Sequence, residues 1–195
     1  MGLHRPARAI LASALLLLAS CGINSIPTAE ETAKARWADV QNEYQRRADL
    51  IPNLVATVKG YAAQEKAVLT QVTEARAKAT AINITTDDLS NPERLRQFSE
   101  AQNQLTQALG QLRTVVEAYP DLKSNQNFLT LQAQIEGTEN RISVARRDYN
   151  AAVQAYNTRI RTFPDAIGAK VIYGSKPMVT FEAAGGAEKA PSVAF

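Results

Sequence analysis

The sequence predicts an all-α, up-and-down helical bundle of three long helices and a short C-terminal helix, in which the first helix is long and kinked. Apolar residues recur at alternating steps of three and four along most of the chain, which is the spacing of one helix face. Only 6% of the 195 residues are aromatic and only 9 are glycine, and this composition favours helices over a sheet. Short polar loops separate the helical segments, so we expect consecutive helices to pack as antiparallel neighbours.

The first 20 residues resemble a bacterial lipoprotein signal peptide. Basic residues precede an apolar run at residues 9–19, which is shorter than the roughly 20 residues that span a bilayer. The run ends in Leu-Ala-Ser-Cys at residues 18–21, which resembles the lipobox, a motif whose cysteine is lipidated and becomes the mature N-terminus. We therefore expect Cys21 to carry membrane lipid (palmitate-type acyl chains) and residues 21–29 to tether that lipid to the fold. The alternative is a buried or free cysteine that happens to follow an apolar run.

Catalytic and metal-binding chemistry has few candidate residues. The only histidine is His4, which cleavage removes, and the only cysteine is Cys21. Histidine-assisted nucleophilic catalysis and histidine-based metal sites are therefore excluded, although carboxylate or lysine chemistry remains open. The adjacent acids Asp87 and Asp88 are more typical of a solvated turn than of a calcium site. We expect a non-enzymatic protein with no cofactor and no metal.

Charge gives no reason to expect a nucleic-acid partner. Removing Arg5 and Arg8 with the signal peptide takes the 22 basic residues to 20, against 19 acidic ones. The chain also has no dense basic patch with interleaved aromatic residues, which is the pattern of nucleic-acid binding.

The first helix is expected to run from Glu30 to about Thr80. Its apolar seam continues through Pro52 without a change of phase, so we expect a kink there rather than an end. Proline removes the hydrogen bond to the carbonyl of Ala48, at a cost of about 3 kcal/mol, and Asn53 is placed to satisfy the loosened backbone groups. Such a helix would be roughly 75 Å long and would project as a stalk beyond the second helix.

Proline and asparagine signals predict the remaining elements. Asn-Pro-Glu at residues 91–93 is a strong helix start, and Pro120 and Pro164 each end a periodic segment. These signals predict a loop at 80–92, a second helix to Tyr119, a third helix at 125–163 and a short helical piece at 165–173. The bundle as a whole is expected over residues 30–173, followed by an extended or disordered tail over 174–195.

Polar residues interrupt the apolar seams. Arg47 and Glu65 lie on the first seam, and Gln102 and Thr138 lie on the others. They either fix the register of the helices from inside or line a partner-binding groove centred on the kink. If the first and third helices are parallel, Glu65 lies near the level of Arg141 and the two form an ion pair. The polar set singled out for either role is Arg47, Pro52, Asn53, Glu65, Arg141, Arg146, Asn150 and Asn157.

The last five residues, Pro-Ser-Val-Ala-Phe, allow two interpretations. Phe195 with a free carboxylate is the type of ligand that carboxylate-capturing domains bind by strand addition. Alternatively, Phe195 packs onto the bundle or the tail is loose.

A motif in the expected first helix, together with several later segments, resembles the signature of the LemA family. The matching residues are RRADLIPNLV at 46–55, VKGYA at 58–62, Glu65, Ala75-Arg76, ARRDYN at 145–150, Asn157, Phe163-Pro164, FEA at 181–183 and APSVAF at 190–195. The resemblance covers nearly everything from about residue 30 onward. It implies a membrane-associated bacterial helical bundle with no established enzymatic activity and no assigned catalytic residues. Many family members carry an N-terminal transmembrane helix, whereas this sequence carries a lipobox.

Together these observations predict a lipid-anchored scaffold or adaptor for other membrane proteins, with an envelope protein as partner. In a bacterium with two membranes, Gly22 after the cysteine favours the outer membrane, facing the periplasm. The alternative is a regulator of envelope stress or proteolysis that binds a membrane protease or its substrate. A lipid or small-molecule carrier is disfavoured, because Leu, Val and Tyr fill the seams and leave no cavity.

Overall fold

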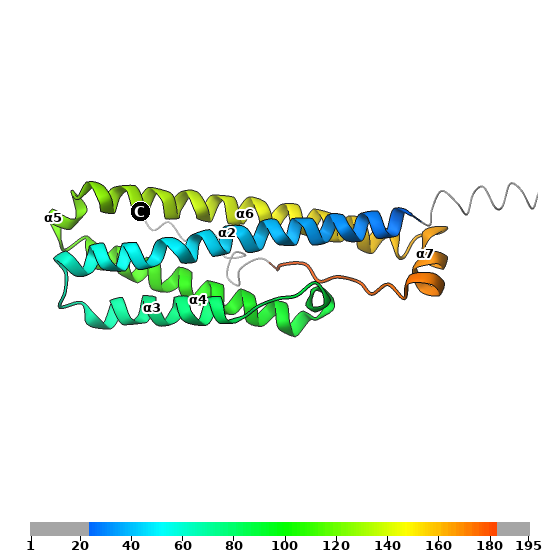
Figure 1. Ribbon diagram of the computed structural model, residues 1–195, viewed down its shortest axis with the longest axis horizontal. Helices are drawn as coiled ribbons and strands as arrows, with labels where there is room; N and C mark the ends of the chain where they lie inside the picture. The colour runs from blue at the N-terminus through cyan, green and yellow to red at the C-terminus, as the bar shows by residue number, and fades with distance from the viewer. Residues whose placement is uncertain (1–23, 183–195) are drawn as a thin grey trace, which may run out of the picture.

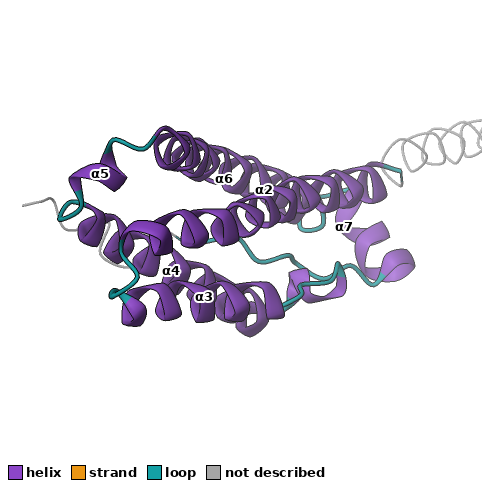
Figure 2. Ribbon diagram, turned by 60° about the vertical axis from the view of Figure 1, so that its left-hand side comes forward, coloured by secondary structure: helices purple, strands orange, loops and turns teal. Residues whose placement is uncertain are grey.

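The computed structural model describes residues 24–182, which form an all-α, up-and-down bundle (Figure 1). Its long helices are α2 (Ser25–Tyr61), α3 (Lys66–Ala81), α4 (Pro92–Val116) and α6 (Gln126–Arg159). Shorter pieces are the 3-10 turn η1 (Asp87–Ser90), α5 (Pro120–Lys123), α7 (Asp165–Gly168) and the π-helical turn η2 (Ala169–Tyr173). The part of the chain described contains no strand (Figure 2), so the predicted fold class is confirmed.

The first helix is shorter than predicted, because the chain turns back after Tyr61. Residues 62–65 form a turn in which the Glu65 amide donates to the Ala62 carbonyl at 3.1 Å. Tyr119, at the end of the α4 segment, holds this turn from outside by donating its hydroxyl to Glu65 Oε1 at 2.7 Å. The spacing of apolar residues continues across the turn, so periodicity could not reveal it. The prediction of one helix to Thr80 that projects as a stalk was wrong, because α3 packs against α4.

This extra turn divides the expected first helix into two antiparallel helices. Every later helix therefore runs opposite to the direction expected for a bundle of three long helices. The pairing of Glu65 with Arg141 was conditional on parallel first and third helices, but α6 is antiparallel to α2 and is its most extensive neighbour. The ring of Trp37, early in α2, lies 5.4 Å from that of Tyr149, late in α6. At the other end, Asn125 at the start of α6 donates to the Tyr61 hydroxyl at 2.9 Å. Helices α3 and α4 form the second closely packed pair.

The starts of the helices follow local sequence signals. Asn91 accepts hydrogen bonds from the amides of Glu93 and Arg94 at the start of α4, as predicted for the Asn-Pro-Glu motif. Asn125 caps α6 in the same way. Helix α2 already begins at Ser25, so residues 25–29 are helical and the predicted tether is too long.

A polar layer divides the core into two apolar clusters. One cluster surrounds Trp37 and includes Tyr44, Phe98 and Tyr149. The other runs from Ile51 on α2 along the opposite half of the bundle. The buried polar residues Arg47, Gln102 and Thr138 lie between them.

Helix α2 continues through Pro52, as predicted, but a different residue satisfies the freed carbonyl. Pro52 has no amide hydrogen for the Ala48 carbonyl. Arg76 of α3 donates its Nε hydrogen to that carbonyl at 2.7 Å. Asn53, the predicted partner, is exposed instead. The turn that makes the helical hairpin therefore also places the residue that compensates for the proline.

We predict that Arg76 and Pro52 are energetically coupled. Arg76→Ala leaves the Ala48 carbonyl unpaired and should lower the free energy of unfolding by about 1–3 kcal/mol. In a Pro52→Ala background the amide of residue 52 can donate to the Ala48 carbonyl. Arg76→Ala should therefore lower the free energy of unfolding by clearly less in that background. Urea unfolding of the four proteins in this cycle measures the coupling, and equal costs in both backgrounds would contradict it. Lys78→Ala, an exposed change on the same helix, is the control.

Candidate functional site

The buried guanidinium of Arg47 is the centre of the polar layer. Its side chain is only 1% exposed. One terminal nitrogen donates to Glu139 Oε1 of α6 at 2.5 Å and to Thr106 Oγ1 of α4 at 2.9 Å. The other donates to Gln102 Oε1 of α4 at 2.6 Å. Arg47 therefore joins α2 to both α4 and α6 through charge-assisted hydrogen bonds.

Gln102 extends this layer to the remaining long helix. Its side-chain Nε2 donates to the Ala79 carbonyl of α3 at 3.2 Å, and its backbone carbonyl accepts from the Thr106 hydroxyl at 3.1 Å. The Tyr44 ring lies 5.2 Å from the Arg47 guanidinium, within the range of a cation–π contact. A single cross-section of the bundle thus connects all four long helices, which favours the structural interpretation of these seam residues.

The predicted ion pair between Glu65 and Arg141 does not form. Glu65 lies in the turn between α2 and α3 and binds Tyr119, which raises the pKa of that phenol by stabilising its protonated form. Arg141 pairs with Glu43 of α2 at 2.9 Å and donates to the Thr138 hydroxyl at 2.9 Å. The prediction failed because α6 runs antiparallel to α2, which places these two residues at different levels.

The chain after α7 returns along α6 as an extended strap, defined here as residues 176–182. Asn157 forms two hydrogen bonds with the backbone of Met178, to its amide at 2.9 Å and to its carbonyl at 2.8 Å. Asn150 forms the same pair with Phe181, at 2.8 and 2.9 Å. The two asparagines are two helical turns apart, and each holds the backbone as a neighbouring strand would.

Tyrosine and arginine side chains complete the docking of the strap. The hydroxyl of Tyr149 donates to the Val179 carbonyl at 2.9 Å, and burial raises the pKa of this phenol, so it remains a donor. Arg146 lies over the Phe181 ring, 4.5 Å from its centroid, and donates to the Glu182 carbonyl at 3.0 Å. Phe181 in turn stacks on Trp37 at 5.7 Å. Arg146, Asn150 and Asn157 therefore bind the chain's own backbone.

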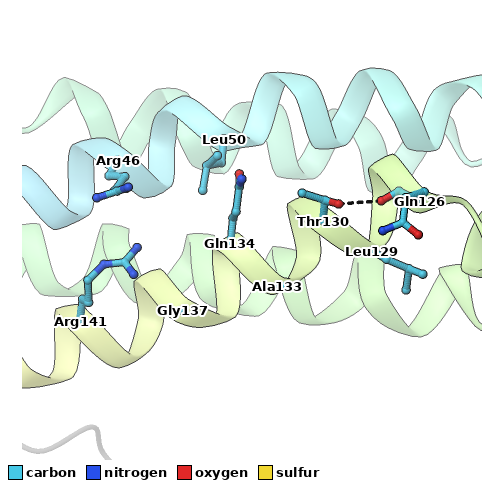
Figure 3. Close-up of a pocket in the computed structure, with 9 residues that line it drawn as sticks. All are labelled: Arg46, Leu50, Gln126, Leu129, Thr130, Ala133, Gln134, Gly137 and Arg141. Carbon is cyan, nitrogen blue, oxygen red and sulfur yellow. Dashed lines mark hydrogen bonds between the residues drawn. The ribbon is translucent and has the colours of Figure 1, made fainter.

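A shallow groove of about 640 Å³ lies between α2 and α6 (Figure 3). Arg46 and Arg141 lie at one end, and Leu129 and Gln126 at the other. Most of its lining residues come from α6. Arg141 is already paired with Glu43, whereas the exposed Arg46 has no ion-pair partner among the described residues.

A second groove separates α4 from α6, and its two halves differ. In one half, strap residues 179–182 lie beside residues 92–103 of α4 and Arg146 of α6. The other half, called the open groove, has a volume of about 410 Å³. Its lining consists of Leu54, Thr106, Leu109, Gly110, Leu112, Arg113, Val116, Phe128, Gln132, Ile135, Glu136 and Glu139. The open groove is mainly apolar, and Arg113 and Glu136 approach within 3.6 Å across it.

Within residues 24–182, no group of histidine, cysteine and acidic side chains is arranged to hold a metal ion. Asp88 accepts hydrogen bonds from the Thr85 amide and hydroxyl, both at 2.9 Å, and these lower the pKa of its carboxyl. Asp88 thus stabilises the turn before α4. The predicted sites Cys21 and Phe195 lie outside the described residues.

Comparison with known proteins identifies the family. The model of the LemA family matches residues 36–195 of the chain. The chain belongs to the LemA family. It is 31% identical over 121 residues to Protein LemA of Metamycoplasma hominis, a match that covers 62% of this chain and 51% of that protein.

Two further relatives are named as magnetosome proteins. Identity is 27% over 157 residues to Magnetosome protein MamQ 2 of Paramagnetospirillum magneticum and 25% over 157 residues to Magnetosome protein MamQ of Magnetospirillum gryphiswaldense. Each match covers 72% of this chain and 58% of the relative. The chain therefore spans little more than half the length of these relatives. Among the helices described, none is both long enough and apolar enough to cross a bilayer.

The residues that carry the LemA resemblance have defined positions in this fold. Arg47 builds the polar layer, Arg76 binds the carbonyl freed by Pro52, and Asn150 and Asn157 hold the strap. Sequence reasoning missed the part played by Arg76 and the strap. The spacing of seven between two asparagines on a helix was a usable signal for the strap, whereas nothing local paired Arg76 with α2.

We predict that Arg47→Met strongly destabilises the bundle. The substitution leaves the buried Gln102 amide without its charged partner, and an unsatisfied buried polar group costs about 1–3 kcal/mol; Glu139 is 37% exposed and can turn to solvent. Replacing Gln102 and Glu139 by leucine as well should recover part of that loss, because the polar groups left unpaired are then absent. Thermal unfolding of the single and triple variants, with exposed Arg36→Met as control, checks this. A triple variant no more stable than Arg47→Met would contradict it.

We also predict that the asparagine pair controls the docking of the strap. Asn150→Ala with Asn157→Ala removes four hydrogen bonds worth about 1 kcal/mol each, so the strap should detach. Trp37 is the only tryptophan, and loss of its stacking on Phe181 should shift its fluorescence emission to longer wavelength. Gln154→Ala, an exposed change between the two sites, should leave the emission unchanged. Unaltered emission in the double variant would contradict the assignment.

Proposed function

We propose that the chain is a non-enzymatic, lipid-anchored envelope protein that holds an extended segment of another membrane protein in the open groove. The observation that carries this proposal is the strap. It occupies one half of the α4–α6 groove as an extended chain whose backbone is bound by Asn150 and Asn157. The same groove continues as the open groove, where Leu109 is partly exposed and the other apolar lining side chains are buried.

The chemistry of the open groove suits an extended segment with apolar side chains at alternate positions. Leu109 is partly exposed in this groove beside the buried Leu112 and Phe128, and it offers an apolar contact to an aliphatic or aromatic side chain. Arg113 and Glu136 at the rim are exposed and only 3.6 Å apart, so they offer both charges to polar groups of a partner. A bound segment would continue the interface that the strap already makes.

The lipobox supports the location. Lipid at Cys21 would hold the bundle at a membrane, since several acyl chains together give stable anchoring. With Gly22 after the cysteine, an outer-membrane position facing the periplasm is the proposal for a bacterium with two membranes. The proposal that the protein is not an enzyme rests on the sequence, in which the only histidine and the only cysteine both precede the bundle.

The polar layer is consistent with a holding function. Arg47 of α2 binds both Gln102 of α4 and Glu139 of α6, so the two walls of the α4–α6 groove are linked through it. A preformed groove loses less conformational entropy when it binds a segment.

Photo-crosslinking in living cells tests the proposal. A photoreactive amino acid at Gln132, in the open groove, should capture one recurring envelope protein through an extended segment. The matched control is Gln134, two residues away on the same helix but in the α2–α6 groove (Figure 3). Equal capture from both positions, or a link from Gln132 only to the chain's own residues, would overturn the adaptor proposal.

A further inference from the structure

The end of the bundle where α2 begins carries an unusual segment, residues 163–173, which we call the end cap. It comprises Phe163, Pro164, α7 and η2. Its large apolar side chains face outward: Phe163 is 82% exposed and Val171 is 77% exposed, and Ile167, Ile172 and Tyr173 are also exposed. Its small residues Gly168 and Ala169 are buried instead. This is the reverse of the polarity expected for a segment that packs on a core and faces water.

Contacts fix the end cap to the first turn of α2. The Ser25 hydroxyl donates to Asp165 Oδ2 at 2.6 Å, and Ile26 is fully buried. A Cβ atom built at Gly168 would lie 3.7 Å from Cδ1 of Ile26, so the cap lies closely on that side chain. Figure 1 places α7 at the same end of the bundle as the start of α2. The exposed apolar side chains therefore move as one body with Ser25.

The distance from Cys21 to this end of the bundle is short. Four residue steps separate Cys21 from Ser25, and a fully extended chain covers at most about 14 Å in that number of steps. If Cys21 carries lipid, Ser25 cannot be farther than this from the membrane surface. Because Ser25 is bonded to Asp165, the end cap is held at the membrane as well.

We propose that the end cap is a membrane-contact surface that inserts its apolar side chains into the lipid headgroup region. This inference rests on the lipid anchor of the proposed function. Apolar side chains at the boundary between headgroups and acyl chains bind in proportion to the area that they bury. The exposed cations Arg161, Lys170 and Lys176 flank these side chains and suit an anionic lipid surface. Tyr173 adds an amphipathic ring of the kind found at membrane interfaces.

Contact through the end cap also sets the orientation of the molecule. The cap lies at one end of the long axis, so the bundle stands away from the bilayer (Figure 1). Ile135 of the open groove is 24 residues along α6 from Arg159, which is about 36 Å of helix. The groove would therefore face a partner segment well above the membrane surface rather than inside it.

Depth-dependent quenching on the full lipidated protein tests the inference. The protein is reconstituted in vesicles of phosphatidylethanolamine and phosphatidylglycerol in a 3:1 ratio. A polarity-sensitive fluorophore is attached to Val171→Cys or, as controls, to Leu129→Cys or Val144→Cys. The control positions are also exposed and apolar, at 43% and 45%, but they lie away from the end cap. We expect brominated lipids to quench the Val171 probe at least twofold more than either control.

The outcomes separate this inference from the proposed anchor. If the parent protein takes up the thiol-reactive dye, Cys21 is free and the lipid anchor fails. If the parent stays unlabelled and bound to vesicles but all three probes are equally accessible to water, only the membrane-contact inference is overturned. A Val171 probe that is shielded equally without vesicles would also overturn it, because a second copy or another surface of the chain then covers the end cap.

Discussion

The buried guanidinium of Arg47 is the constraint on which the rest of the structure depends. Burying a charge is costly unless the charge is paired and hydrogen-bonded. The Nε hydrogen of Arg47 has no partner among the described residues, so its terminal nitrogens carry the pairing. Here Glu139, Gln102 and Thr106 bind its terminal nitrogens, and Gln102 also reaches the backbone of α3. Only one register of the four helices brings these groups together. Apolar side chains above and below the layer supply most of the burial energy, but they would tolerate other registers more readily.

This layer separates two ends with different properties. At one end, aromatic rings of α2, α4 and α6 surround Trp37 and the strap closes over them. At the other end the open groove lies between α4 and α6. The polar layer thus links the helices between the aromatic end and the open-groove end.

The sequence predicted the fold class, the Asn91 cap of α4, the start of α6 near Asn125, and the passage of α2 through Pro52. It did not predict the hairpin between α2 and α3, because residues 62–65 maintain the apolar spacing and contain no proline. That turn is stabilised by Tyr119, more than 50 residues later, so no local signal could identify it. The same error misplaced Glu65 relative to Arg141 and hid the contact of Arg76 with α2. Polar side chains could be recognised from the sequence, but their partners could not.

The stacking of Phe181 on Trp37 has a consequence for the order of assembly. These rings are 144 positions apart in the chain, yet they lie 5.7 Å from each other in one cluster. The N-terminal part of the chain is synthesised first, so Trp37 leaves the ribosome long before Phe181. The aromatic half of the core must remain incomplete until almost the entire chain has been synthesised. The opposite half, whose contacts end at Ile135, can form earlier, and synthesis should therefore yield a partly folded intermediate with an open, ring-lined end.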